Sequence, residues 1–457
     1  MDIQQLEKWD KEYVWHPFTQ MKQYRREKPL IIERGEGHYL IDVEGNKYLD
    51  GYSSLWVNIH GHAHPKLNEA IKQQIDKISH STLLGAANVP SILLAKKLVD
   101  ITPEGLTKVF YSDSGSTSVE IALKMAYLYW KLTDPIQYEH KNKYISLQKA
   151  YHGDTIGSVS VGGVETFHKI FEPILIDRIE TPTPYTYRMP GVNSEEEAKE
   201  QCLQALENVL QQRHDEVAAL IIEPLMQGAA GMISHPDGFL KGVRELCTKY
   251  NVLMIADEVA VGFGRTGTMF ACERENVSPD FLCMAKGITG GYVPLAATMT
   301  TEKVFEAFLG EPDEMKTFFH GHSYTGNQVG CAVALENIKL FESEQIIPKL
   351  QNKIKLFEQQ LERFTQLPNV GDIRQQGMMI GIELVKDRET KEPFPEEWQV
   401  EHEIILEARK NGVIIRQIGA VIILLPPLTI HEDELRTLLN VTYEAIQTVT
   451  ERITQKQ

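Results

Sequence analysis

Short apolar runs alternate with helical patterns through the middle of the chain. Three of these runs end at an ionisable residue: residues 218–222 at Glu223, residues 252–256 at Asp257, and residues 281–285 at Lys286. Leu240 and Val243 mark a helical pattern between two of the runs. Such alternation is typical of a largely parallel sheet covered by helices, so the sequence predicts an α/β fold.

The two ends of the chain differ from this middle region. Residues 38–50 predict a hairpin with its turn at Gly45. Near the other end, residues 350–364 predict an amphipathic helix, and strand-like segments follow at 378–385 and 421–425. We therefore expect a smaller α+β domain, built from both chain ends, beside a larger domain. The expected bounds are residues 1–60 and 336–457 for the two parts of the small domain and residues 61–335 for the large domain.

Composition and charge narrow the classes of partner. The 457-residue chain is 42% hydrophobic and 24% charged, as in folded globular proteins, and its formal net charge is −16. An acidic surface repels nucleic-acid phosphates and anionic lipids, so we expect neither nucleic acid nor a membrane as partner. The five cysteines form no Cys-x-x-Cys pair, and the N-terminus shows no signal-peptide pattern. These features favour a cytoplasmic protein with reduced thiols.

The three ionisable residues at the ends of the runs are the first candidates for a functional site. In a parallel sheet, ligands bind beyond the carboxyl ends of the strands. Glu223, Asp257 and Lys286 are expected to meet there, and a glycine-rich loop over 287–291 follows the lysine. Any one of them alone is better explained as a strand cap or as a member of an ion pair. The three together, with the loop, favour a site.

A second candidate is the segment 111–120, Tyr-Ser-Asp-Ser-Gly-Ser-Thr-Ser-Val-Glu. Its small hydroxylic residues and its glycine join a predicted strand to a helix that we expect to start near Thr117. Backbone N–H groups at a helix start, together with hydroxyls, form a binding cup for a phosphate group. The same residues also fit a helix start that is simply well capped.

Two other patterns are weaker signals. Residues 262–267 fit G-x-G-x-x-G, but they neither follow a strand directly nor open a helix, which disfavours a dinucleotide-binding dehydrogenase. His60, His62 and His64 lie in a segment with glycine and proline and without a nearby carboxylate or cysteine. A loop explains these histidines better than a metal site, and we expect no metal.

Several segments resemble those of a known enzyme family. The similar segments are 16–21, 53–56, 151–155, 257–267 and 320–327. The segments 151–155 and 257–267, with Asp257 and Lys286 at successive strand ends, are similar to class-III aminotransferases of fold type I, which use pyridoxal 5'-phosphate (PLP). The other segments narrow the resemblance to 7,8-diaminononanoate aminotransferases of biotin biosynthesis. The resemblance runs from about residue 15 to residue 427 and implies conversion of 8-amino-7-oxononanoate to 7,8-diaminononanoate.

The resemblance implies three catalytic residues. Lys286 would bind PLP as a Schiff base, and the freed amine would shuttle a proton between the substrate carbon and the cofactor. Asp257 would pair with the pyridine nitrogen and favour its protonated form, which is the better electron sink. Tyr151 would stack on the ring.

The remaining cofactor contacts come from other segments. The resemblance places the phosphate at Gly115, Ser116 and Thr117, and Glu223 would also border the cofactor. Ser323 of a neighbouring subunit would complete the phosphate site, so the resemblance implies a homodimer.

The resemblance also implies a substrate site. Arg416 would hold the substrate carboxylate as a planar fork. Phe18 and Trp56 would line the path of its alkyl chain, and Gly321 would lie in the same site, together with Tyr151 and Lys286.

The chain departs from the family's pattern at positions that leave the PLP chemistry untouched: Ala150, Val261, Leu55, Gln417 and the segment 322–324. Leu55 and the segment 322–324 stand where the adenosylmethionine-using branch has an extra aromatic residue and a Pro-Thr-Phe segment. We therefore expect L-lysine as the amino donor and keep S-adenosylmethionine as the alternative. Two rival functions are another class-III aminotransferase, acting on a diamine or an ω-amino acid, and a PLP-fold regulator without enzymatic activity.

Overall fold

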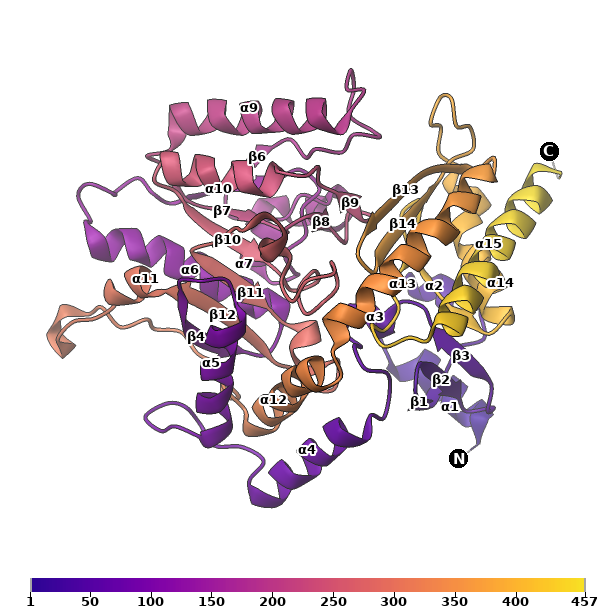
Figure 1. Cartoon of the computed structure of the whole chain (residues 1–457), viewed down its shortest axis with the longest axis horizontal. Coiled ribbons are helices and arrows are strands. Elements are labelled where there is room, and N and C mark those ends of the chain that lie inside the picture. The colour runs from indigo at the N-terminus through magenta and orange to yellow at the C-terminus, as the bar shows by residue number, and fades with distance from the viewer. Residues whose placement is uncertain (1, 456–457) are drawn as a thin grey trace.

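The structure is a computed structural model that describes residues 2–455. Within this range the centre of the molecule is a seven-stranded sheet in the order β4-β12-β11-β10-β7-β5-β6 (Figure 1). Its strands are β4 (Leu106–Ser112), β5 (Lys143–Leu147), β6 (Arg178–Thr181), β7 (Val217–Ile222), β10 (Leu253–Asp257), β11 (Phe281–Met284) and β12 (Ala296–Thr301). β12 runs antiparallel to both neighbours, whereas β6, β5, β7, β10 and β11 are parallel. The predicted mostly parallel sheet is therefore confirmed.

Helices cover both faces of this sheet, because alternate side chains of each strand point to opposite faces. On β7, Ala219 and Ile221 belong to the hydrophobic cluster that contains the buried side chains of α6. Leu220 and Ile222 belong to the cluster that contains those of α9 and α10. The covering helices are α5 (Val89–Ile101), α6 (Gly115–Thr133), α9 (Glu195–Arg213) and α10 (Phe239–Lys249).

Helix α6 begins at Gly115, two residues earlier than the start that we expect from the sequence. Ser114 is its N-cap residue, and its hydroxyl oxygen accepts a hydrogen bond from the Thr117 backbone N–H at 3.3 Å. Such a bond pairs one of the N–H groups that a helix start leaves without a partner. The helix therefore opens within the glycine- and hydroxyl-rich segment itself.

The two chain ends share a second sheet, of order β1-β2-β3-β15. The hairpin predicted over 38–50 is confirmed, since β2 and β3 pair antiparallel around Gly45, whose φ is +87°. Val413 and Ile414 then pair in parallel with Leu49 and Asp50. The strands are β1 (Ile32–Glu36), β2 (Tyr39–Asp42), β3 (Lys47–Asp50) and β15 (Val413–Ile414). The expected small domain from both chain ends is present.

A third, antiparallel sheet of order β13-β14-β17-β16 lies beside the chain ends, and helices α13, α14 and α15 surround it on the right of Figure 1. Its strands and helices are β13 (Val370–Gln376), β14 (Met379–Leu384), β16 (Arg416–Ile418), β17 (Val421–Leu424), α13 (Ile346–Leu361), α14 (Val400–Lys410) and α15 (Glu432–Thr454). These elements include the helix and strands predicted for this part of the chain. Helix α12 (Gln328–Ser343) runs through residue 335, so the proposed domain boundary falls inside a continuous helix.

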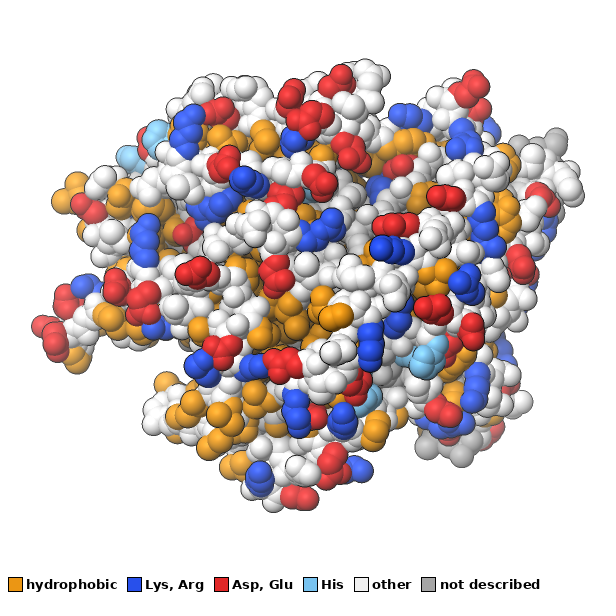
Figure 2. Space-filling model, viewed as in Figure 1, with side chains coloured by type: hydrophobic (Ala, Val, Ile, Leu, Met, Phe, Trp, Pro, Cys, Tyr) orange, Lys and Arg blue, Asp and Glu red, His pale blue; other side chains and the backbone are white. Residues whose placement is uncertain are grey.

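The remaining elements are short or peripheral. They are α1 (Ile3–Tyr13), α2 (Met21–Tyr24), α3 (Ser53–Trp56), α4 (Pro65–Lys77), α7 (Ile156–Ser160), α8 (Glu165–His168), α11 (Glu302–Glu306), β8 (Met226–Gln227), β9 (Ile233–Ser234), and the 3-10 turns η1 (Lys169–Ile174), η2 (Ala271–Glu275), η3 (Lys286–Thr289), η4 (Pro312–Glu314), η5 (Glu362–Gln366) and η6 (Glu396–Trp398). No helix among residues 2–455 is both long enough and apolar enough to cross a membrane. On the face shown in Figure 2, hydrophobic side chains gather next to α5.

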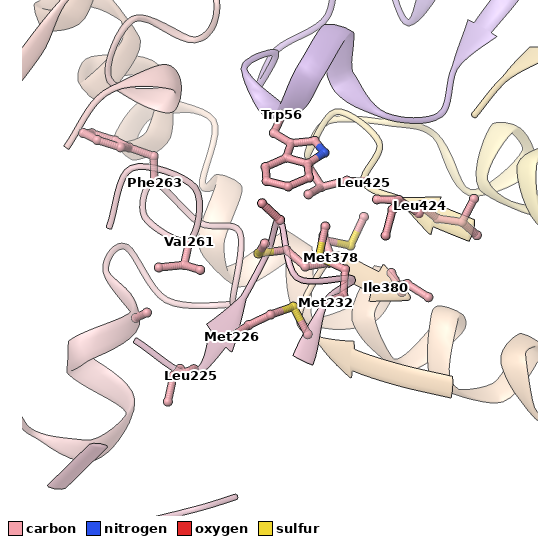
Figure 3. Close-up of a cluster of buried hydrophobic side chains, with 14 of the residues drawn as sticks. Trp56, Leu225, Met226, Met232, Val261, Phe263, Met378, Ile380, Leu424 and Leu425 are labelled. Atoms are coloured by element: carbon pink, nitrogen blue, oxygen red, sulfur yellow. The ribbon is translucent and has the colours of Figure 1, made fainter. Parts of the chain in front are cut away.

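A buried apolar cluster fills the junction between the central sheet and the C-terminal sheet (Figure 3). Trp56 of α3 lies on one side of this cluster, and Met226 and Met232 come from β8 and the turn before β9. Met378 and Leu425 enter it from the C-terminal elements. The junction therefore brings side chains from all parts of the chain to the edge of the central sheet.

Candidate active site

Glu223, Asp257 and Lys286 meet at one edge of the central sheet, as the sequence predicts. Glu223 follows β7, Asp257 ends β10, and Lys286 lies two residues beyond β11. These three strands are parallel neighbours, so their carboxyl ends lie side by side. Glu223 and Asp257 are buried, with 5% and 4% of their surface exposed, and Lys286 is half-buried.

Lys286 has a left-handed backbone conformation, and the pKa of its amine is lowered. Its φ is +46°, in the left-handed region that costs energy for a residue with a side chain and that is often found at functional sites. Burial lowers the pKa of its amine to about 8, and the negative charges of Asp257 and Glu223 oppose that change. Its Nζ atom lies 4.7 Å from the centre of the Trp56 ring. At pH 7 about a tenth of this amine is therefore uncharged and nucleophilic, far more than for an ordinary lysine with a pKa near 10.4.

Asp257 has a partner that the sequence analysis missed. Nδ1 of His152 lies 2.7 Å from Oδ2 of Asp257, and the Val259 backbone N–H donates to the other carboxylate oxygen at 3.1 Å. An ionised carboxylate only accepts hydrogen bonds, so Nδ1 carries the hydrogen. The only sequence signal was that His152 directly follows Tyr151.

Glu223 joins two other parts of the site. Its Oε1 accepts a hydrogen bond from the Tyr151 backbone N–H at 3.1 Å, and its Oε2 accepts one from the Gly228 N–H at 2.9 Å. Burial raises the pKa of this carboxyl to about 7, partly offset by His152. Glu223 thus holds the backbone beside Tyr151 and the start of the turn between β8 and β9.

Tyr151 stands at the centre of a row of aromatic rings. Its hydroxyl donates to Oδ2 of Asp154 at 2.7 Å. The His168 ring stacks nearly parallel to it, with centroids 6.1 Å apart, and the Phe167 ring meets it edge-on at 6.3 Å. Phe167 also contacts Phe18, with centroids 5.3 Å apart. Helix α8 therefore links the predicted substrate residue Phe18 to Tyr151, a link that the sequence analysis did not foresee.

The start of helix α6 lies against the same site. A Cβ atom on Gly115 would come within 2.6 Å of Val259, two residues beyond Asp257. The Ser116 hydroxyl oxygen accepts a hydrogen bond from the Asp154 N–H at 3.1 Å. Gly115, Ser116 and Thr117 are thus brought next to Asp257 and Tyr151, where free N–H groups of the helix start favour an anion.

Three predicted residues lie apart from this centre. Gly321 and Ser323 are exposed, and within the described residues Ser323 forms no hydrogen bond with the start of α6. The ring of the neighbouring Tyr324 lies 4.7 Å from that of His80. Arg416 is exposed at the start of β16.

The residues that do meet fit the chemistry of PLP. A half-buried amine, a buried carboxylate and a helix start rich in hydroxyls lie together at the sheet edge. They match an aldehyde, a pyridine nitrogen and a phosphate, respectively. The buried Ser112 hydroxyl and His152 Nε2 have no hydrogen-bond partner in the described chain, which also fits a polar ligand at this edge.

Comparisons with known proteins agree with this geometry. Residues 21–446 match the family described as Aminotransferase class-III. The adenosylmethionine-8-amino-7-oxononanoate aminotransferase of Aquifex aeolicus is 55% identical over 454 residues, covering 98% of each chain. The relative of the same name from Geobacter sulfurreducens is 52% identical over 450 residues, covering 98% of this chain and 99% of its own.

Solved structures give the same assignment. The crystal structure of the adenosylmethionine-8-amino-7-oxononanoate aminotransferase from Methanocaldococcus jannaschii is similar with a TM-score of 0.93 and 51% identity, covering 98% of this chain and 99% of that one. An omega transaminase from Pseudomonas jessenii in complex with PMP has a TM-score of 0.93 and 31% identity, covering 99% and 100%. The chain therefore belongs to the class-III aminotransferase family and is a PLP-dependent aminotransferase.

Proposed function

We propose that the chain transfers an amino group to 8-amino-7-oxononanoate and yields 7,8-diaminononanoate, a step of biotin synthesis. Relatives that span nearly the whole chain at 50–55% identity have this keto compound in their names. The observation that carries the proposal is the Trp56 ring, 4.7 Å from Lys286 Nζ at the apolar cluster of Figure 3. A flat apolar surface beside the reactive lysine suits a substrate with a long alkyl chain.

The chemistry is divided between the cofactor and the side chains around it. Bound PLP would supply an electron-withdrawing ring that stabilises negative charge on the substrate carbon. The Lys286 amine, with its pKa lowered to about 8, is suited to carry a proton between substrate and cofactor. The Asp257 carboxylate would hold a proton at the ring nitrogen, and His152 orients that carboxylate. Tyr151, whose backbone Glu223 holds, would support the ring face.

Arg416 is our candidate for binding the substrate carboxylate. Burial raises the pKa of the Tyr52 phenol, and the positive charge of Arg416 opposes this rise. Arg416 therefore lies within electrostatic reach of the turn that carries Trp56. A guanidinium offers two parallel donors to a carboxylate, so Arg416 would bind one end of the substrate while Trp56 and Phe18 line its alkyl chain.

We also propose a homodimer, in which Gly321 and Ser323 of one chain reach the site of the other. The segment that carries them lies beside the residues before α5, since the Asn327 side chain donates to the Ser79 carbonyl at 3.0 Å. Exposed apolar side chains gather around both segments: Leu84, Val89, Ile92, Leu93, Phe319 and Tyr324. Figure 2 shows the part of this surface next to α5. A surface of this kind favours association with a second copy.

For the amino donor we propose L-lysine, although the relatives' names contain adenosylmethionine. The adenine ring of S-adenosylmethionine needs a second flat apolar surface beside the one that Trp56 offers. Leu55, beside Trp56, is 51% exposed and offers no aromatic face. Lysine is slim, and the Tyr324 hydroxyl is a polar group available to its far end.

A single-turnover experiment tests both parts of this proposal. Enzyme carrying PLP is mixed with lysine or with S-adenosylmethionine, and the absorbance of the bound aldehyde form is followed. Lysine should bleach this band, and later addition of 8-amino-7-oxononanoate should restore it and release 7,8-diaminononanoate. Efficient bleaching by S-adenosylmethionine alone would overturn the donor assignment.

A different amino acceptor is the main rival. Structures of omega transaminases are similar to this chain, including an (S)-enantioselective enzyme from Thermomicrobium roseum with 36% identity and a TM-score of 0.93. If enzyme pre-loaded with the amino group transfers it to ω-keto acids or ketones but not to 8-amino-7-oxononanoate, the rival function is correct.

We place the reaction in the cytoplasm, because all five cysteines are buried free thiols.

A further inference from the structure

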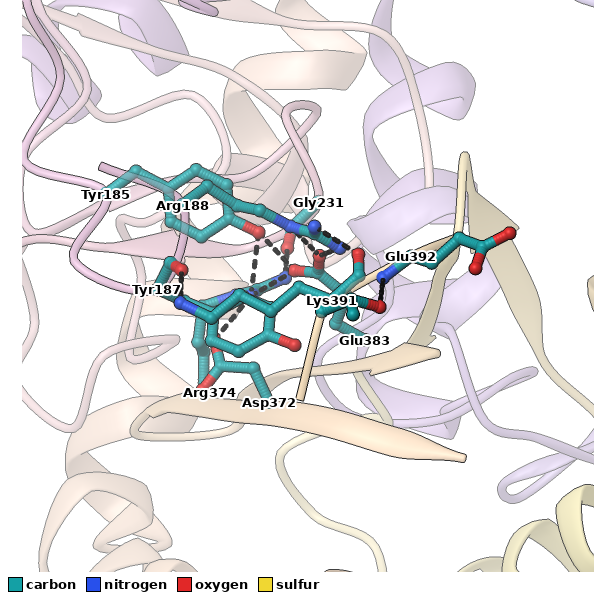
Figure 4. Close-up of polar contacts among 10 residues, drawn as sticks. Tyr185, Tyr187, Arg188, Gly231, Asp372, Arg374, Glu383, Lys391 and Glu392 are labelled. Carbon is teal, nitrogen blue, oxygen red and sulfur yellow. Dashed lines mark hydrogen bonds and ion pairs between the residues drawn. The ribbon is translucent and has the colours of Figure 1, made fainter. Parts of the chain in front are cut away.

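A partly buried ion cluster links the loop after β6 to strands β13 and β14 of the C-terminal sheet (Figure 4). It consists of Arg188, Asp372, Arg374 and Glu383, with Tyr185 attached. Nη1 of Arg374 donates to Asp372 and to Glu383, both at 2.6 Å, and Nε of Arg188 donates to Glu383 at 2.8 Å. The Tyr185 hydroxyl also bonds to Glu383. The cluster holds two positive and two negative charges, so its buried members are paired.

Arg374 also binds two backbone carbonyl groups outside the ion cluster. Its Nε donates to the Met232 carbonyl at 2.9 Å, and its Nη2 donates to the Gly231 carbonyl at 2.8 Å. One planar guanidinium therefore ties β13 to the turn 228–232, which connects β8 to β9. The rigid fork of arginine can serve both carbonyls and both carboxylates at once, whereas a lysine ammonium has only three donors on one atom.

The other end of the turn 228–232 borders the active site. The Gly228 N–H donates to Glu223 at 2.9 Å, and the Gly228 carbonyl accepts the Gly231 N–H at 3.1 Å. A Cβ atom on Gly228 would lie 2.9 Å from Cζ3 of Trp56, so the turn backbone rests directly against that ring. The turn thus forms a short, tightly packed connection from Arg374 to the wall beside Lys286.

We propose that Arg374 is a positioning residue for the aminotransferase reaction. By holding the carbonyls of Gly231 and Met232, it sets the turn 228–232 and, through that turn, the place of the Trp56 ring beside Lys286. Loss of the fork lets the turn and the ring shift, which weakens the fit of the substrate while the lysine, Asp257 and the cofactor stay in place. The inference rests on the proposed function only in assigning Trp56 to the wall of the keto substrate's site.

Arg188 provides a matched control, because it shares Glu383 with Arg374 but not the turn. Its Nη1 also donates to the Lys391 carbonyl at 2.6 Å, and its guanidinium lies 5.0 Å from the centre of the Tyr187 ring. A purely structural role for the cluster predicts that Arg374→Lys and Arg188→Lys both lower the melting temperature and leave KM alone. A positioning role predicts that only Arg374→Lys changes KM.

The first experiment measures steady-state kinetics of the PLP-loaded enzyme with 8-amino-7-oxononanoate. Arg374→Lys should raise KM about tenfold while kcat changes less than about threefold, the pattern of weakened substrate binding. Arg188→Lys should keep KM within about twofold of the wild-type value. Equal KM values in the two variants would overturn the proposal. If Arg374→Lys does not fold, the double variant Arg374→Gln/Glu383→Gln removes one buried charge of each sign and takes its place.

A double-mutant cycle with Trp56→Phe tests the connection itself. If Arg374 acts through Trp56, Arg374→Lys should change KM no more than about twofold in the Trp56→Phe background, because coupled residues are not additive. Independent, multiplicative effects would contradict the proposal. If the wild-type enzyme does not use 8-amino-7-oxononanoate, the proposed function fails instead, and the same cycle with an acceptor that it does use still decides the role of Arg374.

Discussion

The imidazole of His152 donates a hydrogen bond from Nδ1 to Oδ2 of Asp257 over 2.7 Å, in a place where both side chains are buried. A hydrogen bond to a buried charged group is stronger than an ordinary one and fixes its direction. His152 therefore contributes to the active site even though it lies behind the carboxylate.

Replacement of His152 by Phe should slow the reaction without releasing the cofactor. Loss of a hydrogen bond to a charged group costs about 1.5–3 kcal/mol, so kcat should fall roughly 10–150-fold. His152→Asn, whose side-chain amide can still donate to Asp257, should retain more activity. Turnover of the Phe variant close to wild type, measured at full PLP occupancy, would contradict this role.

Asp257→Asn should keep PLP bound but lose the negative charge that favours a proton on the ring nitrogen. The expected cost is about 3 kcal/mol of transition-state stabilisation, on the order of a hundredfold in kcat. Single-turnover rates with a saturating amino donor measure this step. An unchanged rate would show that Asp257 does not maintain the electron sink.

Lys286→Ala should fold normally and lose the covalent link to the cofactor. The wild-type protein should be yellow, and borohydride reduction should fix the cofactor to the chain, whereas the variant should release it on denaturation. Lys353→Ala is the matched control, because burial lowers the pKa of that half-buried lysine to about 8 as well. If Lys286→Ala keeps a reducible linkage, another lysine is the anchor.

The pH dependence of cofactor attachment should reflect the shifted pKa of Lys286. The neutral amine attacks the aldehyde, and burial lowers the pKa of this amine to about 8. The rate of reconstitution from apoenzyme and PLP should therefore rise up to about pH 8 and then level off. An unperturbed lysine would keep gaining reactivity towards about pH 10.4. Stopped-flow absorbance between pH 6 and 10 separates the two cases.

Activity should depend on assembly if Ser323 completes the phosphate site of a second chain. Sedimentation at assay concentration should show a dimer, and Ser323→Ala should weaken PLP binding by about 1 kcal/mol, the usual contribution of one hydrogen bond. Thr317→Ala, at an exposed threonine of the same connection between α11 and α12, is the control. A fully active monomer would contradict the shared site.

The part of the site that could be predicted from the sequence depends on regular secondary structure. Each apolar run ends at the sheet edge, so Glu223, Asp257 and Lys286 could be placed together once the strands were expected to be parallel. The start of α6 could also be placed within the segment 111–120, because glycine and hydroxylic residues favour a helix start.

The contacts that escaped prediction depend on how separate elements pack. Arg374 meets Gly231 only because the C-terminal sheet docks beside the β8–β9 turn, and nothing local to either residue indicates the other. Phe167 meets Phe18 through loops whose path is set by tertiary packing. His152 likewise meets Asp257 across 105 residues of sequence, in a backbone segment whose Gly153, with a φ of +124°, packs against Ser116.

The pairing of β3 with β15 has a consequence for biosynthesis of the chain. Leu49 leaves the ribosome early, and its partner Val413 follows only near the end of translation. At about 5–20 residues per second, the delay is on the order of tens of seconds. The central sheet is complete in sequence once residue 301 has been made, so it can fold in the last part of this interval, while the edge of β3 still lacks its final partner. The N-terminal hairpin is therefore the segment whose protection by chaperones should matter most for the yield of native enzyme.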